Sequence, residues 1–116
     1  MDVEAVVARR ISKAVGVKAF LDVPAEPDAP DTFITVEQTG GSGNFLDEVV
    51  LDIDCWALRG QRRESKALAD RVRAAAIDLD AEPNIFAPHV ENVYRMNDPD
   101  TDRARYVVTV LLRVCE

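Results

Sequence analysis

The stretch RARYVVTVLLRV (residues 103–114) alternates between two sets of side chains and decides the fold class. A side-chain period of two is typical of a β-strand that buries one face. We therefore expect one long strand near the end of the sequence. Its two faces would carry Tyr106, Val108, Val110, Leu112 and Val114 on one side, and Val107, Thr109, Leu111 and Arg113 on the other.

A second alternating stretch, VVLDIDCW, lies at residues 49–56. Its apolar set includes Leu51 and Ile53, and its other set includes Asp52 and Asp54. The two aspartates predict that one face of this strand is solvated or meets a polar partner.

Two further segments have apolar residues at the spacing of an α-helix. One lies between the two strands and the other precedes both. Within residues 61–79, apolar residues recur at steps of three and four, and several alanines favour close packing on a sheet. Residues 3–15 form a second helical stripe, with Asp2 as the N-cap and Gly16 as the terminator.

The remaining chain predicts shorter strands at residues 17–22, 32–38 and 89–95, and loops at 24–31 and 39–48. The element order is then α-β-β-β-α-β-β. This order predicts a single α+β domain over residues 1–116, with an antiparallel or mixed sheet of about five strands and two helices on one face.

Length and composition limit the classes of protein to which this chain can belong. The chain has 116 residues, 47% of them hydrophobic, and a net charge of -7, as expected for one acidic globular domain. We expect no membrane association, because no apolar run approaches the ~20 residues of a membrane-spanning helix. Two cysteines and one histidine leave little material for a disulfide framework or a metal site.

The charges are unevenly distributed along the sequence. Nine acids and no base lie between Lys18 and Arg59. A basic cluster follows immediately and consists of Arg59, Arg62, Arg63 and Lys66. These two segments are either solvated surface or complementary patches that join copies head to tail. The acidic excess disfavours sequence-specific nucleic-acid binding.

No arrangement of catalytic or cofactor-binding residues is evident. The glycine-rich stretch at residues 40–43 lacks the Gly-Lys-Ser/Thr of a phosphate loop and precedes a strand rather than a helix. The spacing of Asp98, Asp100 and Asp102 lacks the glycine and glutamate of a calcium loop and predicts a hairpin turn. His89 has no evident nucleophile partner, and Cys55 and Cys115 lie on expected strands. We expect neither catalysis nor a cofactor.

Several segments together resemble the tail terminator proteins of long-tailed bacteriophages. The first is Phe33-Ile34-Thr35-Val36-Glu37-Gln38-Thr39-Gly40-Gly41, preceded by the proline-rich acidic loop. The others are a strand ending at Trp56-Ala57, a helix containing Ser65-Lys66-Ala67-Leu68-Ala69, and Asn97-Asp98-Pro99-Asp100 leading into Arg105-Tyr106. The resemblance lies in order and spacing from about residue 3 to residue 114.

The resemblance implies a structural virion protein that needs no cofactor. Family members form a hexameric ring that caps the finished tail tube, stops its polymerisation and joins it to the head connector. The expected partners are further copies of the chain, the major tail tube protein and a head-completion (stopper) protein, with genome DNA passing through without specific binding. We expect the protein in the host cytoplasm during assembly and then in the virion.

The resemblance also implies a mobile loop that orders on assembly, which would match residues 39–48. The candidate interface residues are Thr39, Gly40, Gly41, Gly43, Asp47, Glu48, Asp52, Asp54, Arg59, Arg62, Arg63 and Lys66. Another neck or tail-completion protein is the nearest alternative. A cytosolic small-molecule binding module or enzyme is an alternative from a different class.

Overall fold

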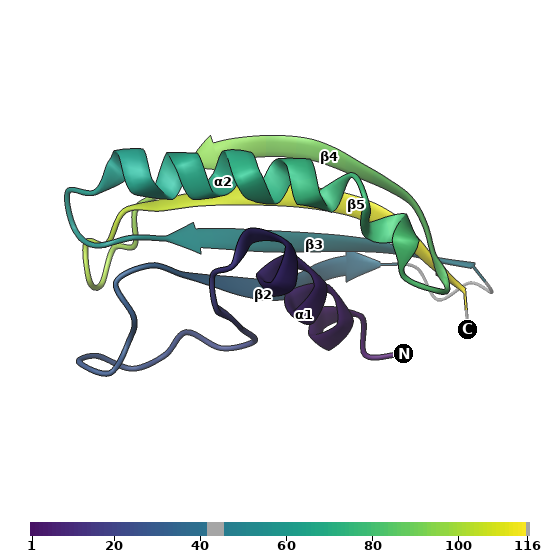
Figure 1. Ribbon diagram of the computed structural model, residues 1–116, viewed down its shortest axis with the longest axis horizontal. Coiled ribbons are helices and arrows are strands. Elements are labelled where there is room, and N and C mark those ends of the chain that lie inside the picture. The colour runs from purple at the N-terminus through teal and green to yellow at the C-terminus, as the bar shows by residue number, and fades with distance from the viewer. Residues whose placement is uncertain (42–45, 116) are drawn as a thin grey trace.

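The computed structural model describes residues 1–41 and 46–115. Figure 1 shows one curved sheet with both helices in front of it. In chain order the elements are α1 (Val3–Val15), β1 (Ala19–Phe20), β2 (Phe33–Gly41), β3 (Leu46–Trp56), α2 (Arg62–Ala76), the 3-10 helix η1 (Leu79–Ala81), β4 (Ile85–Arg95) and β5 (Arg105–Cys115).

The sheet has five strands in the order β1-β2-β3-β5-β4. The pair β1–β2 is parallel, and the other three pairs are antiparallel. The predicted α+β class, with a mixed sheet and two helices on one face, is confirmed. The expected long last strand lies inside the sheet, which explains why both of its faces are largely apolar.

The hydrophobic core lies between the sheet and the two helices. Val7 and Ile11 of α1 and Leu68 and Val72 of α2 pack against the sheet's apolar face. Ala69 and Ala76 are fully buried, as expected where a helix approaches a sheet closely. The strands contribute Ile34, Val36, Leu51, Ile53, Val108 and Val110, all fully buried.

Helix α1 begins and ends at the predicted residues. The backbone N–H of Ala5 donates to Asp2 Oδ1 at 3.1 Å, and Gly16 adopts φ 71°, the left-handed conformation that ends many helices.

Replacing Asp2 by alanine is expected to lower the free energy of unfolding by about 1 kcal/mol, because the cap hydrogen bond is lost. Asp2→Asn is the matched control, since its amide oxygen can still accept the Ala5 N–H. Urea denaturation followed by circular dichroism measures both variants. Equal losses of unfolding free energy in Asp2→Ala and Asp2→Asn would contradict a stabilising role of the cap hydrogen bond.

Several boundaries differ from the predictions. The expected loop at 39–48 is shorter, because β2 continues to Gly41 and β3 already begins at Leu46; residues 42–45 lie outside the described residues. Strand β4 begins at Ile85 instead of residue 89, because register shifts after Phe86 and Val90 break its alternation. Helix α2 stops at Ala76 and is followed by η1.

Candidate functional site

The sheet face that the helices leave uncovered carries a group of carboxylates. Glu37 on β2 lies directly opposite Asp52 on β3, and Asp54 follows two residues later on the same face. Their strand neighbours Val36, Leu51 and Ile53 point into the core on the other face. We call Glu37, Asp52 and Asp54 the acidic patch. The predicted polar face of residues 49–56 is therefore this uncovered face.

Asp54 is a largely buried member of the acidic patch, with 19% of its side chain exposed. Its carboxylate lies 3.6 Å from Arg105 Nη1, and Asp52 Oδ1 accepts a hydrogen bond from Thr109 Oγ1 at 2.9 Å. Burial raises the pKa of Asp54 from its ordinary 3.8 to about 6; Arg105 opposes the shift, and Asp52 and Glu37 add to it. The acidic patch is thus an incompletely neutralised group of anions.

This burial predicts a pH dependence of stability. The unfolded carboxyl ionises near pH 3.8 and the folded one near pH 6, so folding stability falls as the pH rises through this window. The shift already includes the opposing effect of Arg105 and corresponds to about 3 kcal/mol at most; the partial exposure of the Asp54 carboxyl reduces this figure. Asp54→Asn is therefore expected to gain about 1–2 kcal/mol over the wild type at pH 8 and almost nothing at pH 3.5. Urea titrations at both pH values measure this, and a gain that is the same at both would exclude Asp54 ionisation as its cause.

An aromatic stack lies at one end of the acidic patch. The rings of Trp56 and Phe33 are stacked at 5.3 Å between centroids, and the Arg105 guanidinium lies 4.7 Å above Trp56. Beside it is an open depression of about 560 Å³, bordered by Asp54, Glu37 and the segment 21–23. Tyr94 on β4 faces the patch from the other side: burial raises the pKa of its hydroxyl, and Asp52 and Asp54 raise it further.

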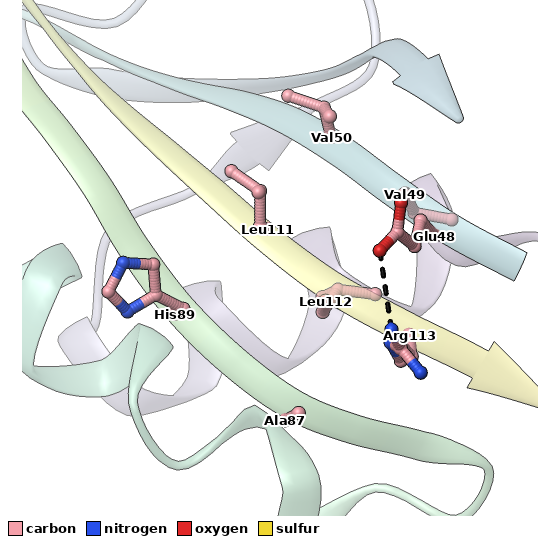
Figure 2. A pocket seen from close by; sticks show the side chains of 8 residues that line it. All are labelled: Glu48, Val49, Val50, Ala87, His89, Leu111, Leu112 and Arg113. Atoms are coloured by element: carbon pink, nitrogen blue, oxygen red, sulfur yellow. Dashed lines mark hydrogen bonds and ion pairs between the residues drawn. The ribbon is translucent and has the colours of Figure 1, made fainter. Parts of the chain in front are cut away.

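The other half of the uncovered face is more apolar. Figure 2 shows Val50, Leu111 and His89 side by side on β3, β5 and β4. They line a depression of about 230 Å³, and its border includes an ion pair of 3.3 Å between Glu48 and Arg113. His89 is exposed, and its neighbours Val50 and Leu111 in this row are aliphatic, so they provide no nucleophile or proton-transfer partner for the imidazole.

The predicted basic residues lie elsewhere on the molecule. Arg62 and Arg63 are exposed at the start of α2, on the helical layer. Lys66 pairs with Asp70 one turn later at 2.6 Å, and Arg59 pairs with Asp102 at 3.0 Å. The structure therefore does not bring the acidic and basic candidates together within one subunit.

The remaining candidates are divided between the two faces of the sheet. Asp47 lies on the face of Val49 and Leu51, where its Oδ1 is buried with no hydrogen-bond partner among the described residues. Its neighbour Glu48 lies on the uncovered face. Thr39, Gly40 and Gly41 belong to β2, and Gly43 lies outside the described residues. A Cβ on Gly41 would lie 2.8 Å from the Glu48 carbonyl oxygen, which explains glycine there.

Sequence reasoning did not select Glu37, Tyr94 or Arg105 as site residues. Alternation in the strand predicted at 32–38 could have placed Glu37 on one face with Thr35. The positions of Arg105 and Tyr94 beside the patch follow only from the pairing of β3, β5 and β4.

The part of the chain that the structure describes has neither a cluster of metal-ligating side chains nor a helix that could span a membrane. No group of three or more His, Cys, Asp or Glu among residues 1–41 and 46–115 is placed to hold a metal ion. None of the helices formed by these residues is long and apolar enough to cross a bilayer.

Comparison with known proteins identifies the fold. No family model matches the chain, and no curated protein does. Among solved structures, a chain from the "Virion of native gene transfer agent (GTA) particle" is similar, with a TM-score of 0.67 and 18% sequence identity. The match covers 97% of this chain and 93% of that chain. This protein therefore shares its fold, over almost the whole length of both chains, with a virion component.

Proposed function

We propose that this protein is a structural component of a phage-like virion, and that within it the protein acts as the tail terminator. In this role it caps the finished tail tube as a ring, stops tube polymerisation and provides the joint to the head connector. The observation that carries the proposal is the fold shared with a chain of the gene transfer agent virion. The terminator resemblance of the sequence, centred on residues 33–41, supports the more specific role.

The distribution of surface groups is compatible with a role in assembly. A closed ring of more than two copies needs two different complementary surfaces on each subunit. The uncovered sheet face and the exposed helical face are two such surfaces. The net charge of -7 also disfavours adhesion to phosphates, so genome DNA could pass through the ring without being held.

The test is negative-stain electron microscopy of growing tail tubes with and without the protein. We expect a ring at one tube end and tubes that stop lengthening. An unrelated acidic protein of similar size is the control, and it should leave growth unchanged. A protein that ignores tubes but binds the head connector would be another neck or tail-completion protein. Binding to neither would contradict the proposal.

A further inference from the structure

The two layers of the subunit carry opposite charge. Helices α1 and α2 together contain eight Lys and Arg against three Asp and Glu, while the five strands of the sheet contain three against six. Both helices lie on one face of the sheet (Figure 1), so the positive side chains gather on one side of the molecule. Such a polarised subunit favours association of unlike faces.

The positive charge of α2 is only partly neutralised within the subunit. Lys66 pairs with Asp70, and the Arg71 guanidinium donates to the Val15 carbonyl oxygen. In the part of the chain that the structure describes, Arg62, Arg63 and Arg73 make no ion pair, and all three are exposed. Arg62 and Arg63 also lie in the first turn, where the helix dipole disfavours cations. An external anionic partner would offset that cost.

The negative charge of the acidic patch is likewise only partly neutralised within the subunit. Arg105 is the cation that reaches it among residues 1–41 and 46–115, and it pairs with Asp54. Glu37 and Asp52 have no cationic partner in that same part of the structure. Partly desolvated anions interact more strongly with a docking cation than solvated ones do.

We propose that α2 of one copy docks on the acidic patch of the next copy, with Arg62 and Arg63 facing Glu37 and Asp52. This inference rests on the proposed ring. The contact joins two different surfaces on opposite sides of the subunit, so it is heterologous and leads to a closed ring or an open array instead of a two-fold dimer.

The size of the uncovered face fits such a contact. Strands of nine to eleven residues give a face about 35 Å long and about 20 Å wide, roughly 700 Å² in area, of which the end at Phe33 and Trp56 is already buried within the subunit. A stable protein interface buries about 800 Å² on each partner. The apolar half of the face, including Val50 and Leu111, would supply the hydrophobic part of the contact.

Two charge-reversal variants test the proposal. The sheet variant carries Glu37→Lys and Asp52→Lys, and the helix variant carries Arg62→Glu and Arg63→Glu. Each would repel its own copies, whereas a mixture restores opposite charges at every junction. A third variant, Arg9→Glu with Lys13→Glu on exposed positions of α1, changes the net charge as much as the helix variant does and is the matched control.

Sedimentation velocity at low salt measures how much of the protein forms rings in solution. Electron microscopy counts the rings at tube ends. We expect each variant alone to assemble at least about tenfold more weakly than the wild type, the equimolar mixture to recover, and the α1 control to assemble normally. Circular dichroism verifies that each variant is folded, and the helix variant retains its fold because acids favour the first turn of a helix.

Two outcomes overturn the proposal. In the first, the charge-reversal variants form rings as well as the wild type does. In the second, the equimolar mixture forms no more rings than either variant alone, both in solution and at tube ends. Either result shows that α2 does not dock on the acidic patch. If the wild type still caps tubes in that case, the terminator function stands. A wild type that forms no ring in solution or on tubes overturns both.

Discussion

Replacing Arg103 by alanine is expected to lower the free energy of unfolding by about 3 kcal/mol, because a buried guanidinium and its hydrogen bonds to one carboxylate and two backbone carbonyls are lost. Arg103 is 6% exposed although it is a charged residue. Its Nε lies 2.7 Å from Glu26 Oε1, and its Nη1 donates to the carbonyl oxygens of Pro30 at 3.2 Å and Asp31 at 3.1 Å. The guanidinium also lies 5.2 Å from the centroid of the Phe33 ring.

This one side chain therefore holds the proline-rich acidic segment against the start of β5. Arg103→Lys is expected to recover only part of the loss, because an ammonium cannot bind a carboxylate and two carbonyls in the same planar arrangement. The Arg103 guanidinium also covers the Phe33 ring of the aromatic stack, so Arg103→Ala should expose part of that stack.

Urea denaturation followed by tryptophan fluorescence measures both effects, since Trp56 is the single tryptophan of the chain. The control is Arg59→Ala, whose side chain is 79% exposed and pairs with an exposed Asp102. Its expected cost is below about 0.5 kcal/mol. Equal costs for Arg103→Ala and Arg59→Ala would contradict the anchoring role.

The fold could be predicted from the sequence because its elements are strongly periodic. The alternation at residues 49–56 and 103–114 reflects strands that must present one face to the core. Asp2 and Gly16 are local signals that act within a few residues, so α1 was placed to the residue. Strand β4 was placed four residues late, because Ala87, with φ 51°, and Pro88 interrupt its alternation.

The arrangement of the site could not be predicted in the same way. Periodicity tells which residues of one strand share a face, but the neighbours across strands depend on the pairing register. Glu37 joins Asp52 only because β2 and β3 pair in the observed register. Arg103 contacts Glu26 across 77 positions of sequence, and no local pattern specifies that contact. The charge pattern did identify Asp52, Asp54, Arg62 and Arg63, but it could not show that they lie on opposite sides of the subunit.

Replacing Trp56 by alanine is expected to cost about 4 kcal/mol of unfolding free energy, in the range observed for deleting a buried aromatic side chain. Trp56 is 2% exposed and lies between the Phe33 ring and the Arg105 guanidinium. Its indole Nε1–H donates to Thr35 Oγ1 at 3.0 Å. The variant loses the stacking on both sides and leaves a cavity beside β2.

Two milder substitutions separate the hydrogen bond from the ring packing. Thr35→Val leaves the indole N–H buried without its acceptor and is expected to cost about 1–2 kcal/mol. Trp56→Phe keeps an aromatic ring but removes the donor. If the hydrogen bond matters, Thr35→Val should cost clearly less in the Trp56→Phe background than in the wild type, because no donor remains to be left unpaired. Chemical denaturation of the four proteins, followed by circular dichroism, gives the coupling energy. A coupling energy of zero would mean that Trp56 stabilises this end of the sheet through ring packing alone.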